Sequence, residues 1–319
     1  MPKILTLIVP CYNEEAVLPD SSGKLKKIMD ELIAKEKISK HSQILFVNDG
    51  STDKTWSIIQ LLEDQDEIFS GIRLSRNFGH QNAVMAGLSK AVSFSDYMIT
   101  IDCDLQDDEN KIIEMIDKAN AGKDIVFGVR NDRQSDTNFK RNTANGFYWL
   151  MNKMGIKLIP NHADFRLMTK RAVTAMLEYQ EDNLFLRGIV TELGFETDYV
   201  YYKRKPRLAG ESHYPFKKMV ALALNGITSF TTVPLKLISY LGFAICLVSF
   251  LGLIIIHRDI LGLSLWLLGG IQILTIGVVG LYISKIFTDV KKRPRFIIED
   301  DEYSFKQRFQ QKKIVLMKK

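Results

Sequence analysis

The sequence is poor in cysteine. Cys11, Cys103 and Cys246 are the only ones in 319 residues, and they show no paired spacing. This excludes a small disulfide-stapled secreted domain and predicts reduced thiols in a cytosolic domain. Internal repeats and low-complexity segments are also lacking. The start of the chain, MPKILTLIVP, is too short an apolar run for a secretory signal, so we expect none.

Charge is almost absent from two long apolar runs in the last third of the chain. Residues 233–256 carry one charge, on Lys236, and residues 260–284 carry none. About 20 apolar residues span the hydrocarbon layer of a bilayer. Helices buried in a soluble core normally keep a polar stripe, which these runs lack. We therefore predict a hairpin of two transmembrane helices, with two buried core helices as the alternative.

Charges that flank the hairpin predict its orientation. Its turn, at 257–259, holds one arginine, whereas KKRPR at 291–295 holds four basic residues. Basic residues gather on the cytoplasmic side, so we expect both termini in the cytoplasm, beneath an inner or plasma membrane. The net charge of +6 and the basic excess near the membrane suit an anionic lipid surface. No nucleic-acid partner is expected.

The first two hundred residues alternate short apolar runs with helical patterns. Strands are expected at 4–10, 43–49, 71–75, 97–102 and 124–130. Strands separated by single helices pair in parallel through right-handed crossovers, which predicts a mostly parallel, Rossmann-like α/β sheet.

Polar residues follow four of these strands at the point where each ends. They are Asn13 and Glu14, Asp49, Arg76 and Asn77, and Asp102 and Asp104. Because ligands of such sheets bind at the carboxyl ends of the strands, we expect one site to collect these side chains. The acidic residues that follow, Asp107, Asp108 and Glu109, are expected to cap the next helix, where its dipole favours acids.

Three motifs, in this order and spacing, carry a specific resemblance. VPCYNEE at 9–15, VNDGSTDKT at 47–55 and DCDLQDDE at 102–109 resemble the family 2 glycosyltransferases of the GT-A fold. The later motifs ADFRLM, FLRG and AGESHYP, followed by two apolar runs, look like the polyprenyl-phosphate glycosyltransferases, which include the bactoprenol glucosyltransferases. The resemblance extends to about residue 300.

The resemblance implies a donor site for a nucleotide sugar, with UDP-glucose as the expected donor. Its binding residues would be Pro10, Tyr12, Asn13, Glu14, Asp49, Arg76 and Asp102. Asp102 and Asp104 would form a D-x-D motif that binds Mg²⁺ or Mn²⁺, with Gln106 completing the metal's surroundings. A nucleoside diphosphate leaving group requires such charge neutralisation.

The resemblance also implies an acceptor site for polyprenyl phosphate, whose anionic head requires cations close to the bilayer. Its phosphate-binding residues would be Arg130, Arg133, Lys140, Arg141, Arg204, Arg207, Ser212 and His213. Catalytic roles fall to Asp104, Arg187 and Asp164, the candidate base. A phosphate monoester has a second pKa near 6, so the acceptor hardly needs deprotonation, and Asp164 is expected to position a substrate more than to remove a proton. Orienting Arg166 is its alternative role.

The chain is therefore predicted to divide into four parts. They are a catalytic domain at 1–211, an amphipathic interfacial segment at 212–232, the two spans within 233–287, and a basic tail at 288–319. The expected reaction is inverting sugar transfer to polyprenyl phosphate at the cytoplasmic face. The donor could instead be UDP-N-acetylglucosamine, UDP-galactose or GDP-mannose. The alternative functions are a processive polysaccharide synthase, a sugar-1-phosphate transferase and an inactive membrane scaffold. The family resemblance implies a homo-oligomer, such as a tetramer. Because two spans are too few to form a translocation path, a separate flippase is expected to move the product.

Overall fold

The computed structural model describes residues 2–131, 162–179, 186–205 and 261–301, together with Tyr303 and six single positions between 235 and 245. Its strands are β1 (Leu5–Cys11), β2 (Gln43–Asn48), β3 (Phe69–Leu74), β4 (Tyr97–Thr100), β5 (Ile125–Arg130), β6 (His162–Thr169), β7 (Thr197–Tyr202) and β8 (Ile298–Asp301). Its helices are α1 (Leu18–Ala34), α2 (Thr55–Gln65), α3 (His80–Ala91), α4 (Lys111–Asn120), α6 (Lys170–Leu177), α7 (Leu186–Glu192) and α10 (Leu261–Val290).

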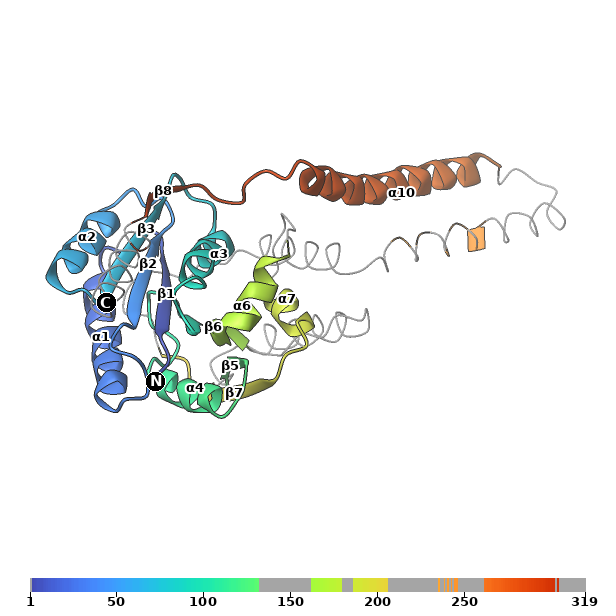
Figure 1. Ribbon diagram of the computed structural model, residues 1–319. Coiled ribbons are helices and arrows are strands. Elements are labelled where there is room, and N and C mark those ends of the chain that lie inside the picture. The colour runs from blue at the N-terminus through green and yellow to red at the C-terminus, as the bar shows by residue number, and fades with distance from the viewer. Residues whose placement is uncertain are drawn as a thin grey trace.

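The strands form one sheet in the order β7-β5-β6-β4-β1-β2-β3-β8. Strands β1 to β4 run in parallel, and β5 and β7 share their direction. The reversed strands are β6, which pairs with β4 and β5, and β8, which pairs with β3. The predicted, mostly parallel α/β sheet is therefore confirmed (Figure 1).

Helices cover both faces of the sheet, which explains why its central strands are almost wholly apolar. Every residue of β1 and of β2 is buried. One core lies beneath α1, α2 and α4, where Leu25, Ile59 and Met115 are fully buried. The other lies beneath α3, α6 and α7, where Leu88, Val173 and Ile189 are fully buried. A strand buried on both faces loses the alternation of polar and apolar residues that an exposed face would impose.

The structure departs from the predicted strand pairing at one position. The first five strands occur as expected, but β5 does not lie beside β4. Strand β6, which carries ADFRLM, lies between them and is antiparallel to both. The sequence pattern did not predict β6, β7 or β8 as strands. Because β6 lies next to β4, the ADFRLM motif of β6 is placed at the edge of the sheet where the parallel strands end.

The second apolar run is the helix α10, which extends away from the sheet (Figure 1). Within it, Leu268–Val290 is long and apolar enough to cross a membrane, and it is the one such stretch in the described part of the chain. Several of its apolar side chains are exposed, among them Ile273 and Ile276. The first run lies outside the described residues, apart from the six single positions, which are helical. The interfacial segment at 212–232 lies outside them entirely.

The chain returns to the sheet domain after α10. Strand β8 pairs with the edge strand β3, and Tyr303 is fully buried, with its hydroxyl 3.1 Å from Oγ1 of Thr6. Lys90 and Asp301 form an ion pair at 2.6 Å. The described residues that follow α10, predicted as a tail, are thus part of the sheet domain.

Candidate functional site

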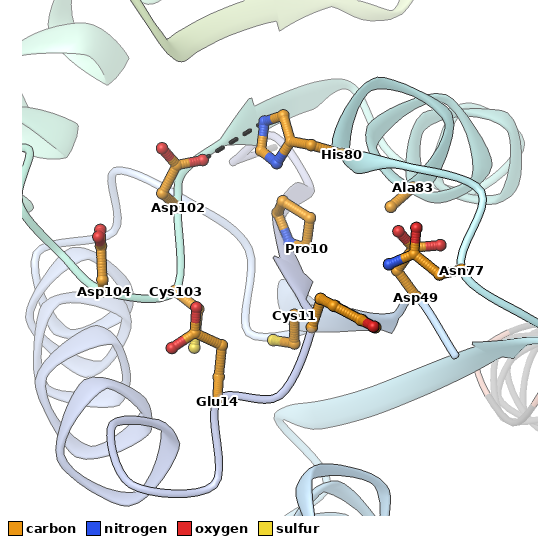
Figure 2. Close-up of a pocket in the computed structure, with 11 residues that line it drawn as sticks. Pro10, Cys11, Glu14, Asp49, Asn77, His80, Ala83, Asp102, Cys103 and Asp104 are labelled. Carbon is orange, nitrogen blue, oxygen red and sulfur yellow. Dashed lines mark ion pairs between the residues drawn. The ribbon is translucent and has the colours of Figure 1, made fainter. Parts of the chain in front are cut away.

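A cavity of about 250 Å³ opens at the carboxyl ends of β1, β2 and β4. It is lined by Pro10, Cys11, Tyr12, Glu14, Asp49, Asn77, His80, Ala83, Asp102, Cys103 and Asp104 (Figure 2). These residues come from the ends of three neighbouring strands, from the β3–α3 loop and from the first turns of α3. Five of the seven polar residues expected at this edge of the sheet line the cavity: Glu14, Asp49, Asn77, Asp102 and Asp104.

The loop after β1 is joined to the loop after β2 by side chains. The backbone N–H of Asn13 donates to Ser51 Oγ at 3.0 Å, and Asn13 Oδ1 accepts from the N–H of Thr52 at 2.9 Å. The N–H of Glu14 donates to Thr55 Oγ1 at 2.9 Å. Asn13 has a φ of 55°, in the left-handed region that asparagine tolerates. Asn13 does not line the cavity; it fixes the loop that presents Tyr12 and Glu14.

Asp49 joins the second strand to the third loop. Its carboxylate accepts hydrogen bonds from the N–H groups of Phe78 and Gly79, at 2.7 and 2.9 Å. Burial raises the pKa of Asp49 above its ordinary value, against the opposing effect of these two hydrogen bonds. The adjacent Gly50 has a φ of 63°, and a Cβ there would lie 2.3 Å from the carbonyl carbon of Arg76. Asp49 therefore lines the predicted nucleotide site while its oxygens hold the β3–α3 loop.

His80, the first residue of α3, lies between two carboxylates. Its Nε2 is 3.5 Å from Oδ1 of Asp102 and 3.8 Å from Oδ2 of Asp164. Figure 2 shows the Asp102 side chain turned toward His80. Partial burial raises the pKa of Asp102; the carboxylates of Asp164, Asp107 and Asp104 add to the rise, and His80 opposes it. His80 is a site residue that the sequence interpretation missed; it begins α3, after the loop that follows β3.

Asp164, which lies near the same Nε2 of His80 as Asp102, is held between two arginines. Arg166, which is 1% exposed, donates to Asp164 Oδ1, and Nη2 of Arg187 lies 3.3 Å from Oδ2. The Thr100 hydroxyl donates to the backbone carbonyl of Asp164 at 2.6 Å, which fixes β6 against the end of β4. Burial would raise the pKa of Asp164, but Arg187 and Arg166 hold it well below its ordinary value. Asp164 is thus a carboxylate at neutral pH and a weak base, and its predicted link to Arg166 is present.

Asp102 and Asp104 are alternate residues after β4, and both line the cavity. Within the described ranges, no group of three or more histidine, cysteine, aspartate or glutamate side chains is placed to bind a metal ion. Two carboxylates nevertheless suit a hard divalent cation that takes its other oxygens from a diphosphate and from water. The donor set therefore fits Mg²⁺ or Mn²⁺ bound together with a substrate phosphate.

The remainder of the acidic run forms ion pairs with basic residues from β5 and from the segment that follows β7. Arg130 forms an ion pair with Asp107, and Lys205 pairs with Asp108 and Glu109 at 3.2 and 2.5 Å. Helix α4 begins after Asn110 without a side-chain cap, and the acid in its first turn is Glu114. The prediction that Asp107, Asp108 and Glu109 cap this helix is wrong: their carboxylates pair with Arg130 and Lys205, and Asp108 also accepts from Asn110, which precedes the first helical residue.

Several predicted site residues lie away from the cavity. Gln106, expected near the metal, is 6% exposed, and its Oε1 accepts from Arg204. Arg204 and Arg130 contact Gln106 and Asp107, and their expected place at the acceptor phosphate stays a prediction. Arg76 is exposed and lies over the Phe78 ring, 4.0 Å from its centroid. Six predicted acceptor residues lie outside the described residues: Arg133, Lys140, Arg141, Arg207, Ser212 and His213.

Comparison with known proteins identifies the family. Residues 6–179 match the sequence profile described as glycosyl transferase family 2. The chain belongs to this family. This glycosyltransferase is 47% identical to the uncharacterized glycosyltransferase YkoT of Bacillus subtilis over 94% of its own length and 93% of the relative's. It is 40% identical to a prophage-derived bactoprenol glucosyl transferase of Shigella flexneri, over 92% of its own length and 97% of the relative's. The predicted membership of family 2 is thereby confirmed.

The solved structures that resemble this glycosyltransferase are more distant. Glucosyl-3-phosphoglycerate synthase of Mycobacterium tuberculosis, solved with Mn²⁺, UDP-glucose and phosphoglyceric acid, is 15% identical and aligns with a TM-score of 0.45. The alignment covers 71% of this chain and 78% of the synthase. At this distance the likeness adds nothing to the assignment of individual residues.

Proposed function

We propose that this glycosyltransferase moves a sugar, glucose from UDP-glucose, to the phosphate of a polyprenyl phosphate with inversion at the anomeric carbon. The observation that carries the proposal is the grouping of two pairs of charged residues near His80: Asp102 and Asp104, which line the cavity, and Asp164 with its ion-pair partner Arg187. Such a site has an acidic half suited to a metal-bound diphosphate and a cationic half suited to an anionic acceptor.

The donor would bind in the cavity at the ends of β1, β2 and β4. Tyr12, which is 47% exposed, offers a ring at the rim for the base, and Asp49 keeps the β3–α3 loop in place beneath it. Asp102 and Asp104 would hold Mg²⁺ or Mn²⁺ against the diphosphate, where such an ion neutralises the charge that develops on the leaving group. Glu14 and Asn77 complete the polar wall.

The acceptor phosphate would bind near Arg187, whose side chain is 39% exposed and so remains accessible. Because the phosphate is mostly a dianion at neutral pH, its oxygen can attack the anomeric carbon without a strong base. Asp164 then acts by orienting Arg187 and Arg166, and its lowered pKa supports this role. Catalysis would come mainly from positioning and charge neutralisation. A bactoprenol glucosyl transferase among the relatives supports a polyprenyl acceptor.

The two apolar runs would anchor the enzyme to the membrane as a helical hairpin, with the active site on the cytoplasmic side. The chain enters α10 from the first run and returns directly to β8 of the sheet domain. Both ends of a two-span hairpin would then lie on the side of the catalytic domain. A hairpin is too small to move the product across the bilayer, so we expect a separate flippase. A homo-oligomer, such as a tetramer, also belongs to the proposal.

A donor screen tests the proposal. The purified full-length enzyme is incubated with undecaprenyl phosphate, Mn²⁺ or Mg²⁺, and one of UDP-glucose, UDP-galactose, UDP-N-acetylglucosamine or GDP-mannose. Mass spectrometry of the lipid is expected to find a hexosyl monophosphate product with UDP-glucose, together with free UDP. Release of UMP and a pyrophosphate-linked lipid would identify a sugar-1-phosphate transferase. No product with any donor would favour the scaffold alternative.

A further inference from the structure

A second cavity lies where the chain leaves α10, apart from the donor site. Its volume is about 490 Å³, and its lining residues come from α3, from the end of α6 and from the segment that follows α10. Leu268–Val290, the stretch able to cross a membrane, ends only two residues before Lys292, which lines the cavity. Figure 1 shows the segment after α10 running past α3 to β8. If α10 spans the bilayer, this cavity lies at the level of the lipid headgroups.

The wall formed by the segment after α10 is fixed on the sheet domain. Arg295 donates to the backbone carbonyl of Tyr179, and the N–H of Ser75 donates to the carbonyl of Ile297 at 3.0 Å. Phe296 packs on the core beneath α3. Lys292 adopts a φ of 47°, and its N–H donates to the carbonyl of Asp289 at 3.2 Å, which ends the helix in a tight turn. These contacts hold this wall of the cavity against the sheet domain.

The lining combines apolar and cationic side chains. Met85, Leu177 and Phe296 provide apolar surface, whereas Lys292, Arg293 and Arg295 provide positive charge. None of the residues that line the cavity is acidic. Lys292 and Arg293 are exposed, so both can reach a ligand from the solvent side. A phosphate attached to an apolar chain matches this lining better than a free phosphate, which would leave the apolar half unused.

We propose that this cavity binds the headgroup of an anionic membrane phospholipid, distinct from the polyprenyl phosphate substrate. The phosphate would contact Lys292 and Arg293, and the first carbons of the acyl chains would lie against Met85 and Leu177. The proposal depends on α10 crossing the membrane and not on the identity of the donor or the acceptor. It assigns this junction a lipid-binding role in addition to anchoring.

Lipid titration of the full-length protein in zwitterionic detergent tests the proposal. Short-chain phosphatidylglycerol is added, and binding is followed by native mass spectrometry. Arg293→Gln removes one charge from the lining and is expected to weaken binding about fivefold. Ser89→Phe fills the cavity from α3 without changing charge and is expected to weaken binding as much. Lys291→Gln, the matched control, removes a charge one residue outside the lining and is expected to leave binding unchanged.

Three competitors separate the possible ligands. Short-chain phosphatidylcholine and glycerol phosphate are expected to displace phosphatidylglycerol poorly, because one lacks net charge and the other lacks acyl chains. Equal losses in Arg293→Gln and Lys291→Gln, with none in Ser89→Phe, would overturn the proposal in favour of diffuse surface attraction. Displacement by glycerol phosphate would overturn it in favour of a free phosphate compound. Displacement by polyprenyl phosphate would make the cavity part of the acceptor path, and absence of binding would reject it.

Discussion

Arg130 and Asp107 form a largely buried ion pair in which Nε and Nη2 of the arginine lie 2.8 and 2.7 Å from the same carboxylate oxygen. The Asp107 side chain is 1% exposed, and that of Arg130 is 26% exposed. The pair joins the acidic run after β4 to the end of β5. Burial of a lone carboxylate is costly, so loss of Arg130 is expected to destabilise the fold.

Arg130→Met is therefore expected to lower the free energy of unfolding by about 3 kcal/mol, because it leaves Asp107 buried and unpaired. Urea unfolding of the detergent-solubilised enzyme measures this. Arg130→Met/Asp107→Leu should recover most of the loss. As a control, Lys26→Gln breaks exposed pairs with Asp30 and Asp66 and should cost less than about 1 kcal/mol. An unchanged stability with a raised KM for polyprenyl phosphate would instead place Arg130 at the acceptor.

Asp104→Asn is expected to reduce kcat about 100-fold or more, because it removes one of two carboxylates placed for the divalent ion. Asp108→Asn is the matched control: it makes the same change in the same run, but Asp108 pairs with Lys205 outside the cavity. Initial rates measured across a Mn²⁺ titration, with urea unfolding of both variants, provide the test. Similar losses in the two variants would remove the distinction between the cavity acids and the rest of the run.

Asp164→Asn is expected to lose about 100-fold in kcat at every pH, without recovery under alkaline conditions. The reason is that Arg187 and Arg166 hold the pKa of Asp164 below its ordinary value of about 3.9, so the group is ionised throughout the working range. Its contribution to stability is present above the unfolded pKa and is lost only as pH falls through the folded pKa. A pH–rate profile checks this. An acid limb in the wild type that disappears in Asp164→Asn would show that Asp164 acts as a base.

Tyr303→Ala is expected to lower the free energy of unfolding by about 3 kcal/mol, since it removes a fully buried ring that contacts Phe94 edge to face. Tyr303→Phe should cost about 1 kcal/mol, because only the hydrogen bonds to Thr6 and Ser95 are lost. Urea unfolding gives both values, and limited proteolysis reports whether the chain after α10 detaches. Wild-type stability in both variants would contradict the docking of this segment.

The main features of the sheet could be predicted from local sequence. The runs that became β1 to β5 are each apolar enough to be buried on both faces, and helical patterns separate them. The reversed strand β6 could not be predicted in this way. Its pairing with β4, which joins Thr100 to Arg166, spans more than sixty residues and depends on which sheet edge is free. No periodicity within either strand contains that information.

The candidate site, too, could be predicted only in part from the sequence. Asp49, Asp102 and Asp104 follow strands that the sequence identifies, so their arrival at one edge was predictable. His80 was missed because a single histidine at a helix start has no distinctive pattern. Arg204 and Arg130 were predicted to bind the acceptor phosphate. Their contacts with Gln106 and Asp107 could not be predicted, because the partners are far apart in the sequence.

The sequence by itself determined the family, the alternation of strands and helices, the acidic motif after the fourth strand and the apolar run that became α10. These depend on residue type and on spacing along the chain, which are local properties. Only the tertiary structure decided which acids face the cavity and which are neutralised by Arg130 and Lys205. It also decided that β8, which follows α10, extends the sheet beside β3. Such pairings follow from distances between segments that are remote in sequence, and those distances exist only once the sheet has formed.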